Sequence, residues 1–144
     1  MQTGLLHLHN LLRWVILITL LLSLVHAFQK NEKLGKSSLW LMIAAHTTLL
    51  IGLFQWFTGP FGLHAISESG FGAIMKDKAS RYWAVEHAMS MIIAILLITI
   101  GRGKAKKLNY KAAGWLYLVT LLILLATIPW PFKELVGRPW FPGM

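Results

Sequence analysis

Four long apolar runs constrain this chain more than any other feature of its sequence. They cover roughly residues 5–28, 39–57, 82–100 and 112–129, and each is about as long as a helix must be to cross the hydrocarbon core of a bilayer. Of the 144 residues, 56% are hydrophobic and 13% are charged, a composition too apolar for an ordinary soluble domain. The sequence therefore predicts an all-α, multi-pass integral membrane protein with one transmembrane domain over residues 1–144.

The connections between the runs predict the topology. Short connections favour an up-down antiparallel four-helix bundle. Basic residues concentrate in the first and third connections, which indicates that these face the cytoplasm: Lys30, Lys33, Lys36, Arg102, Lys104, Lys106, Lys107 and Lys111. Both termini then lie on the outer, periplasmic side. Because this distribution accounts for the net charge of +9, we expect no nucleic-acid partner.

Two segments outside the runs are expected at the outer membrane surface. Residues 58–81 form a loop in which five glycine and proline residues interrupt any long helix. Residues 130–144 hold several prolines and two tryptophans, so we expect a non-helical strap lying at the interface.

The candidate functional residues are ionisable side chains inside the runs. Such side chains cost about 2.5 to 3.5 kcal/mol each on insertion scales, so they indicate functional sites. His9 and His87 are expected roughly 6 Å and 9 Å below the outer boundary, which makes them nearly level. The first and third helices of such a bundle are diagonal neighbours, so both imidazoles can ligate one haem iron from opposite sides. The chain has no cysteine, so any such group is held non-covalently.

Three further residues are candidates for the same site. Arg13 follows His9 by one helical turn and requires an anion, which is either a haem propionate or Glu86. His46 is expected about 10 Å from the cytoplasmic boundary and is an alternative partner for His87. The structural alternative is a buried polar network of these residues that fixes the helix packing.

Three segments of the chain resemble those of a known family. LHLHNLLRW in the first run, AAHTTLLIGLFQWF in the second and EHAMSMIIAILLITIGR in the third resemble small bacterial four-helix membrane proteins of the cytochrome B or cytochrome b-like type. The resemblance implies a non-covalent haem b, with His9, His46 and His87 as iron-ligand candidates and Arg13 and Glu86 as supporting groups. It also implies a place in the bacterial inner membrane. The two histidine pairs of di-haem cytochromes b are lacking here, which argues against a two-haem path.

The leading functional hypothesis is therefore a b-type membrane cytochrome in electron transfer, rather than a stand-alone enzyme. Its expected partners are the lipid bilayer, a larger membrane complex, and a quinol pool or a periplasmic electron carrier. One alternative is a cofactor-free structural or assembly subunit. Another is a metal-binding or proton-conducting bundle that uses three histidines and a carboxylate.

Overall fold

The computed structural model of the chain describes residues 2–141, without the side chain of Gln2; the last three positions of the expected strap lie outside the described residues. Within this range the protein is all-α and contains no strand. Its helical elements are α1 (Gln2–Phe28), α2 (Leu34–Thr58), α3 (Leu63–Ser69), α4 (Phe71–Lys76), α5 (Lys78–Arg81), the π-helix η1 (Tyr82–Glu86), α6 (His87–Lys106) and α7 (Tyr110–Thr127).

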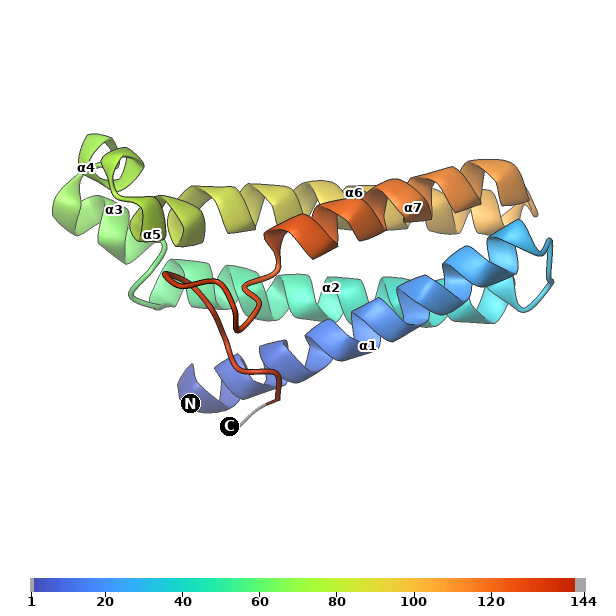
Figure 1. Cartoon of the computed structure of the whole chain (residues 1–144), viewed down its shortest axis with the longest axis horizontal. Coiled ribbons are helices and arrows are strands. Elements are labelled where there is room, and N and C mark those ends of the chain that lie inside the picture. Colours follow the sequence, from blue (N-terminus) through green and yellow to red (C-terminus); the bar gives the residue numbers. More distant parts are fainter. Residues whose placement is uncertain (1, 142–144) are drawn as a thin grey trace.

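Four long helices pack side by side and alternate in direction (Figure 1). The packed neighbours are α1 with α2, α2 with α6, α6 with α7, and α7 with α1, so α1 and α6 are diagonal. Among the described residues, these four stretches are long and apolar enough to cross a membrane. The expectation of an all-helical chain is thereby confirmed, and the four long apolar helices are those that a multi-pass membrane protein requires.

Two of the long helices extend beyond the apolar runs at one end of the bundle. α2 begins at Leu34 and α6 ends at Lys106, whereas the runs cover only residues 39–57 and 82–100. The added residues include Ser38, which is fully buried and whose hydroxyl donates to the carbonyl of Gly35. Arg102 donates to the same carbonyl and to the Ser38 hydroxyl. Polar groups bonded in this way are compatible with helix packing, so apolarity alone makes these two helices too short at this end of the bundle.

The core combines large and small side chains. Leu20, Leu34, Leu41 and Tyr117 are fully buried, and alanines at other buried positions let the helix backbones approach closely. α6 and α7 are closely packed at Gly101, where an added Cβ would lie 2.8 Å from Cε1 of Tyr117. Large apolar side chains also cover the outside of the bundle, as expected of a surface that faces lipid.

The segment between α2 and α6 consists of short helices rather than a single loop. Gly70, with φ of 82°, joins α3 to α4, a conformation that glycine adopts without a steric penalty. Asp77 caps α5 by accepting hydrogen bonds from the backbone and hydroxyl of Ser80. These helices lie at one end of the bundle, and the tail crosses the bundle near that end (Figure 1).

The tail after α7 contains no helix in its described part. Prolines 129, 131 and 139 interrupt regular backbone hydrogen bonding there. The tail folds back onto α1, where Asn10 Nδ2 donates to the carbonyl of Pro139 at 3.1 Å and Trp14 Nε1 donates to that of Trp140. The rings of Trp14, Trp130 and Trp140 pack together. The tail is therefore a fixed strap across the bundle.

Candidate functional site

The structure brings His9 of α1 close to His87 of α6. Their ring centroids are 6.3 Å apart, with 52° between the ring planes. The two helices are diagonal in the bundle, so these side chains meet across its interior. A metal ion held axially by two imidazoles, with bonds of about 2 Å, separates the ring centroids by roughly 6 Å. The observed separation fits this arrangement.

Both histidines line one large cavity between the helices. Its volume is about 950 Å³, near the upper end of the range for small-molecule and cofactor sites. Most of the wall is apolar and comes from all four long helices, with Ile16, Leu49, Met91, Ile95 and Leu124 among the lining residues. The cavity is therefore large and apolar enough for a tetrapyrrole.

The π-helix η1 immediately precedes His87. The backbone N–H of His87 donates to the carbonyl of Tyr82, five residues earlier, instead of to the carbonyl four residues earlier. This wider turn changes the direction in which the following side chains leave the helix, and such turns are frequent at functional sites. The apolar pattern of the run gave no indication of it.

Tyr82 determines which nitrogen of His87 is available. Its hydroxyl donates to the backbone carbonyl of Thr127 and lies 3.3 Å from Nδ1 of His87. Because the hydroxyl proton is already donated to the carbonyl of Thr127, the hydroxyl oxygen can act toward His87 only as an acceptor. It therefore accepts from Nδ1–H of a neutral imidazole. Nε2 of His87 then carries the lone pair that a metal requires.

His9 lies beside Gly52 of α2, which has no side chain to fill the space there. An added Cβ at Gly52 would lie 3.5 Å from Nε2 of His9, and both residues line the cavity. Within residues 2–141, the His9 ring has no hydrogen-bond partner. A partly buried imidazole with no such partner is a fitting ligand for a group in the cavity.

His46 is placed differently from the other two candidate ligands. Its Nδ1 lies 2.9 Å from the carbonyl of Met42, and its Nε2 lies 3.3 Å from the hydroxyl of Thr99. His46 is not among the residues that line the cavity. The described residues contain no group of three or more potential metal-ligating side chains, so the three histidines are not gathered at one point.

Arg13 lines the cavity and is 7% exposed. One of its terminal nitrogens donates to the strap carbonyls of Pro139 and Trp140, at 3.0 and 2.9 Å. Its guanidinium also lies over the rings of Trp14 and Trp130, at 5.2 and 5.7 Å from their centroids. Arg13 thus binds the tail and is not paired with Glu86.

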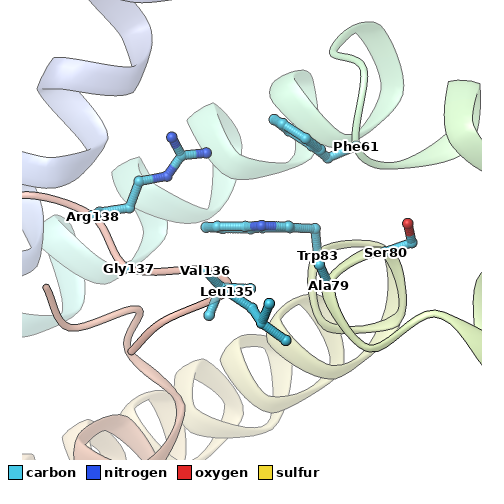
Figure 2. A pocket seen from close by; sticks show the side chains of 8 residues that line it. All are labelled: Phe61, Ala79, Ser80, Trp83, Leu135, Val136, Gly137 and Arg138. Carbon is cyan, nitrogen blue, oxygen red and sulfur yellow. The ribbon is translucent and has the colours of Figure 1, made fainter. Parts of the chain in front are cut away.

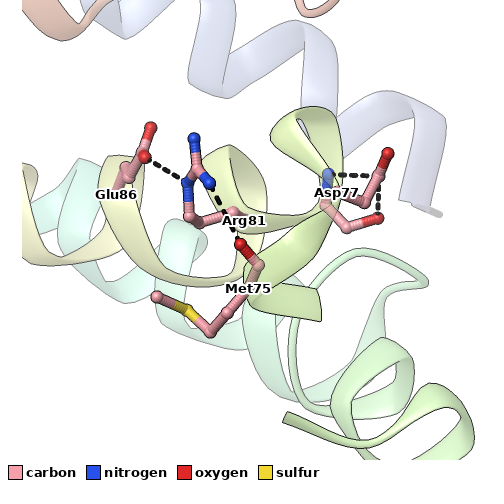
Figure 3. Close-up of polar contacts among 5 residues, drawn as sticks. Met75, Asp77, Arg81 and Glu86 are labelled. Atoms are coloured by element: carbon pink, nitrogen blue, oxygen red, sulfur yellow. Dashed lines mark hydrogen bonds and ion pairs between the residues drawn. The ribbon is translucent and has the colours of Figure 1, made fainter. Parts of the chain in front are cut away.

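Glu86 does not line this cavity. Arg81 Nε donates to its carboxylate at 2.7 Å, and the same guanidinium donates to the carbonyl of Met75 (Figure 3). The side chains of Arg81 and Glu86 are 32% and 48% exposed. In the structure, therefore, Glu86 fixes the start of the third span to the short helices.

Arg138 is a cavity residue that sequence reasoning missed. Its guanidinium carbon lies 4.7 Å from the ring centroid of Trp83 and 5.9 Å from that of Phe61 (Figure 2). These three side chains line both the large cavity and a second pocket of about 220 Å³ beside it. Burial lowers the pKa of Arg138. The sequence shows this residue only as one cation of a Pro-rich tail, with no sign that it reaches the bundle interior.

The site thus combines two imidazoles, two arginines and an apolar wall in one cavity. This set can hold a flat metal-containing group with acidic substituents, while its apolar lining excludes water. Comparison of the chain with protein-family models, with curated proteins and with solved structures finds no match in any of the three.

Proposed function

We propose that the protein binds one haem b non-covalently between His9 and His87 and transfers single electrons in the membrane. The observation that carries this proposal is the 6.3 Å separation of the two ring centroids in a cavity of about 950 Å³. Two neutral imidazoles at this separation are the ligand set of a six-coordinate haem.

The residues around the cavity have separate roles in this function. His9 and His87 would hold the iron, and Tyr82 would keep His87 in the tautomer that leaves Nε2 free. When bound, haem supplies reversible one-electron chemistry between ferric and ferrous iron. The positive charges of Arg13 and Arg138 favour the state with the additional electron, and therefore raise the reduction potential.

We further propose that the protein lies in the bacterial inner membrane with both termini on the periplasmic side. The supporting observation is the concentration of Lys and Arg in the first and third connections. The cavity then lies toward the outer leaflet, where a quinol or a periplasmic carrier can exchange electrons with it. We propose that the bundle acts as a subunit or accessory of a larger membrane complex.

An optical spectrum of the purified protein tests the haem proposal directly. We expect a Soret band that shifts and sharpens on reduction with dithionite, together with the α-band of six-coordinate haem b. Protein produced with ample haem that shows no such bands would overturn the proposal. If it is also free of bound metal, a cofactor-free structural or assembly subunit is the better explanation. A stoichiometric transition metal without haem would instead favour the metal-binding or proton-conducting alternative.

Single-cysteine labelling tests the orientation, since the chain has no cysteine of its own. Ser67→Cys lies in α3 and Lys107→Cys follows α6, and both positions are exposed. A membrane-impermeant maleimide applied to intact spheroplasts should label the first variant alone, whereas both should react after lysis. The reverse labelling would show the opposite orientation.

A further inference from the structure

The cavity wall contains two arginines whose hydrogen-bonding capacity is only partly used. Nε of Arg13 and Nε of Arg138 are both buried, and neither has a hydrogen-bond partner in the described part of the chain. A guanidinium has five N–H donors, and in a buried position these normally find acceptors.

Neither arginine has a carboxylate partner within residues 2–141. The ion pairs there join His64 to Glu68 and Arg81 to Glu86. Arg13 donates only to neutral backbone carbonyls, and Arg138 lies over aromatic rings. Arg13 is buried and Arg138 is partly buried. Cations in such positions are costly without an anion, so an anion in the same cavity would be favoured.

The strap binds one of the two arginines and carries the other. Its carbonyls at Pro139 and Trp140 accept from Arg13, while the backbone N–H of the adjacent Arg138 donates to the carbonyl of Pro129. The side chain of Arg138 then passes over Trp83, which also contacts His87 with 5.5 Å between ring centroids. Both arginines therefore belong to the wall of the histidine cavity.

We infer that Arg13 and Arg138 form a carboxylate-binding subsite within this cavity, for a ligand that carries two acidic groups on an apolar body. The inference rests on the proposed function for the identity of that ligand, a dicarboxylic porphyrin whose two propionates pair with the two guanidinium groups. Planar guanidinium groups match carboxylates in geometry and in charge. The subsite itself acts without iron, because it recognises the acidic substituents and not the metal.

Metal-free porphyrins separate this subsite from the iron ligands. The full-length protein, purified without haem in a neutral detergent, is titrated with protoporphyrin IX and with its dimethyl ester, and binding is followed by porphyrin fluorescence. The two probes share the apolar ring and differ in their carboxylates. We expect the wild-type protein to bind the acid roughly tenfold or more tightly than the ester, as charge-assisted hydrogen bonds would provide.

The variant that carries the test is Arg138→Gln, because the buried Nε of this side chain makes no hydrogen bond in the described structure and the hydrogen bonds between the strap and Arg13 do not involve it. It should abolish most of the preference for the acid and leave ester binding unchanged. Arg13→Gln should do the same, with an additional loss of strap contacts. Arg138→Lys, which keeps the charge, should restore part of the preference. The matched control is Arg81→Gln, at a position outside the cavity wall, and it should bind both probes as the wild type does.

The outcomes distinguish this inference from the haem proposal. Equal binding of acid and ester by the wild type, or an unchanged preference in Arg138→Gln, would overturn the subsite even if the protein shows a six-coordinate haem spectrum. An arginine-dependent preference for the acid in a protein that never shows that spectrum would support the subsite and overturn the haem function. Failure to bind either metal-free porphyrin would overturn the subsite, whereas the haem function would still be decided by the optical spectrum of protein produced with ample haem.

Discussion

The hydroxyl of Tyr82 lies 3.3 Å from Nδ1 of His87 and donates its own proton to the carbonyl of Thr127. This chain of contacts connects the π-helix, the start of α6 and the end of α7. A neutral His87 then donates its Nδ1–H to the tyrosine oxygen, which leaves the lone pair of Nε2 free to bind a metal. One phenol group thereby determines the tautomer and the orientation of a ligand in the proposed haem site.

Tyr82→Phe should weaken haem retention by about 10- to 100-fold, because loss of a hydrogen bond to a ligating histidine typically has this effect on metal affinity. The measurement is haem occupancy after dilution into haem-free detergent, read from the reduced-minus-oxidised spectrum. Tyr110→Phe, at the start of α7 and outside the cavity wall, is the control and should retain haem normally. Equal retention in both variants would show that Tyr82 does not orient the ligand.

His87→Ala should eliminate the six-coordinate spectrum, whereas His46→Ala should leave it unchanged. His46 is outside the cavity wall, and both of its ring nitrogens lie near other acceptors or donors. The comparison requires optical spectra of the two variants purified side by side. Loss of the spectrum in His46→Ala, with its retention in His9→Ala, would assign the second ligand position to His46.

Gly52→Leu should prevent haem binding by filling the space beside His9. An added Cβ at this position would already lie 3.5 Å from Nε2 of His9, so further carbon atoms would enter the cavity. The control is Gly103→Leu, since nothing lies within 4 Å of a Cβ there and both changes raise helix propensity equally. Haem content per protein decides the result, and full occupancy of Gly52→Leu would contradict the location of the site.

Gly101→Ala should destabilise the bundle by about 1 to 3 kcal/mol, as overpacking of a core usually does. The added methyl group would lie 2.8 Å from Cε1 of the fully buried Tyr117. Reversible unfolding in detergent measures the free energy of unfolding, and Gly103→Ala at an open position should be neutral or slightly stabilising. A Gly101→Ala protein as stable as the wild type would contradict the close packing of α6 on α7.

Glu86→Gln should have little effect, changing the free energy of unfolding by no more than about 1 kcal/mol, because partly exposed ion pairs contribute this little. Haem occupancy should remain that of the wild type, since Glu86 pairs with Arg81 and does not line the cavity. The same spectral and unfolding measurements apply. Substantial haem loss in this variant alone would restore Glu86 as a supporting group of the site.

The apolar runs were sufficient to predict the four long helices. A helix buried in lipid must satisfy its backbone within itself, so run length reveals a span without knowledge of its neighbours. The helix ends at Leu34 and Lys106 were not predictable in this way. They depend on partners such as the Ser38 hydroxyl and Arg102, which come from different helices.

The partners of the charged residues also depended on the tertiary structure. Arg13 and Glu86 have opposite charges and lie in apolar runs that could bring them together. In the structure, however, Arg13 donates to carbonyls of the strap, and Glu86 forms an ion pair with Arg81. Neither the course of the strap nor the position of α5 follows from hydropathy, because both segments are irregular or short. Arg138 lines the cavity only because the tail folds back onto α1.

The sequence by itself determined the helical class, the four apolar spans and the presence of His9 and His87 at similar depth, since these follow from periodic local properties and a fixed rise per residue. Only the tertiary structure decided that the two rings come within 6.3 Å, that a π-turn and Tyr82 orient one of them, and that Arg138 joins Arg13 on the cavity wall. These relationships depend on the rotation of each helix about its axis and on long-range contacts of the strap, which arise from the packing of the whole chain.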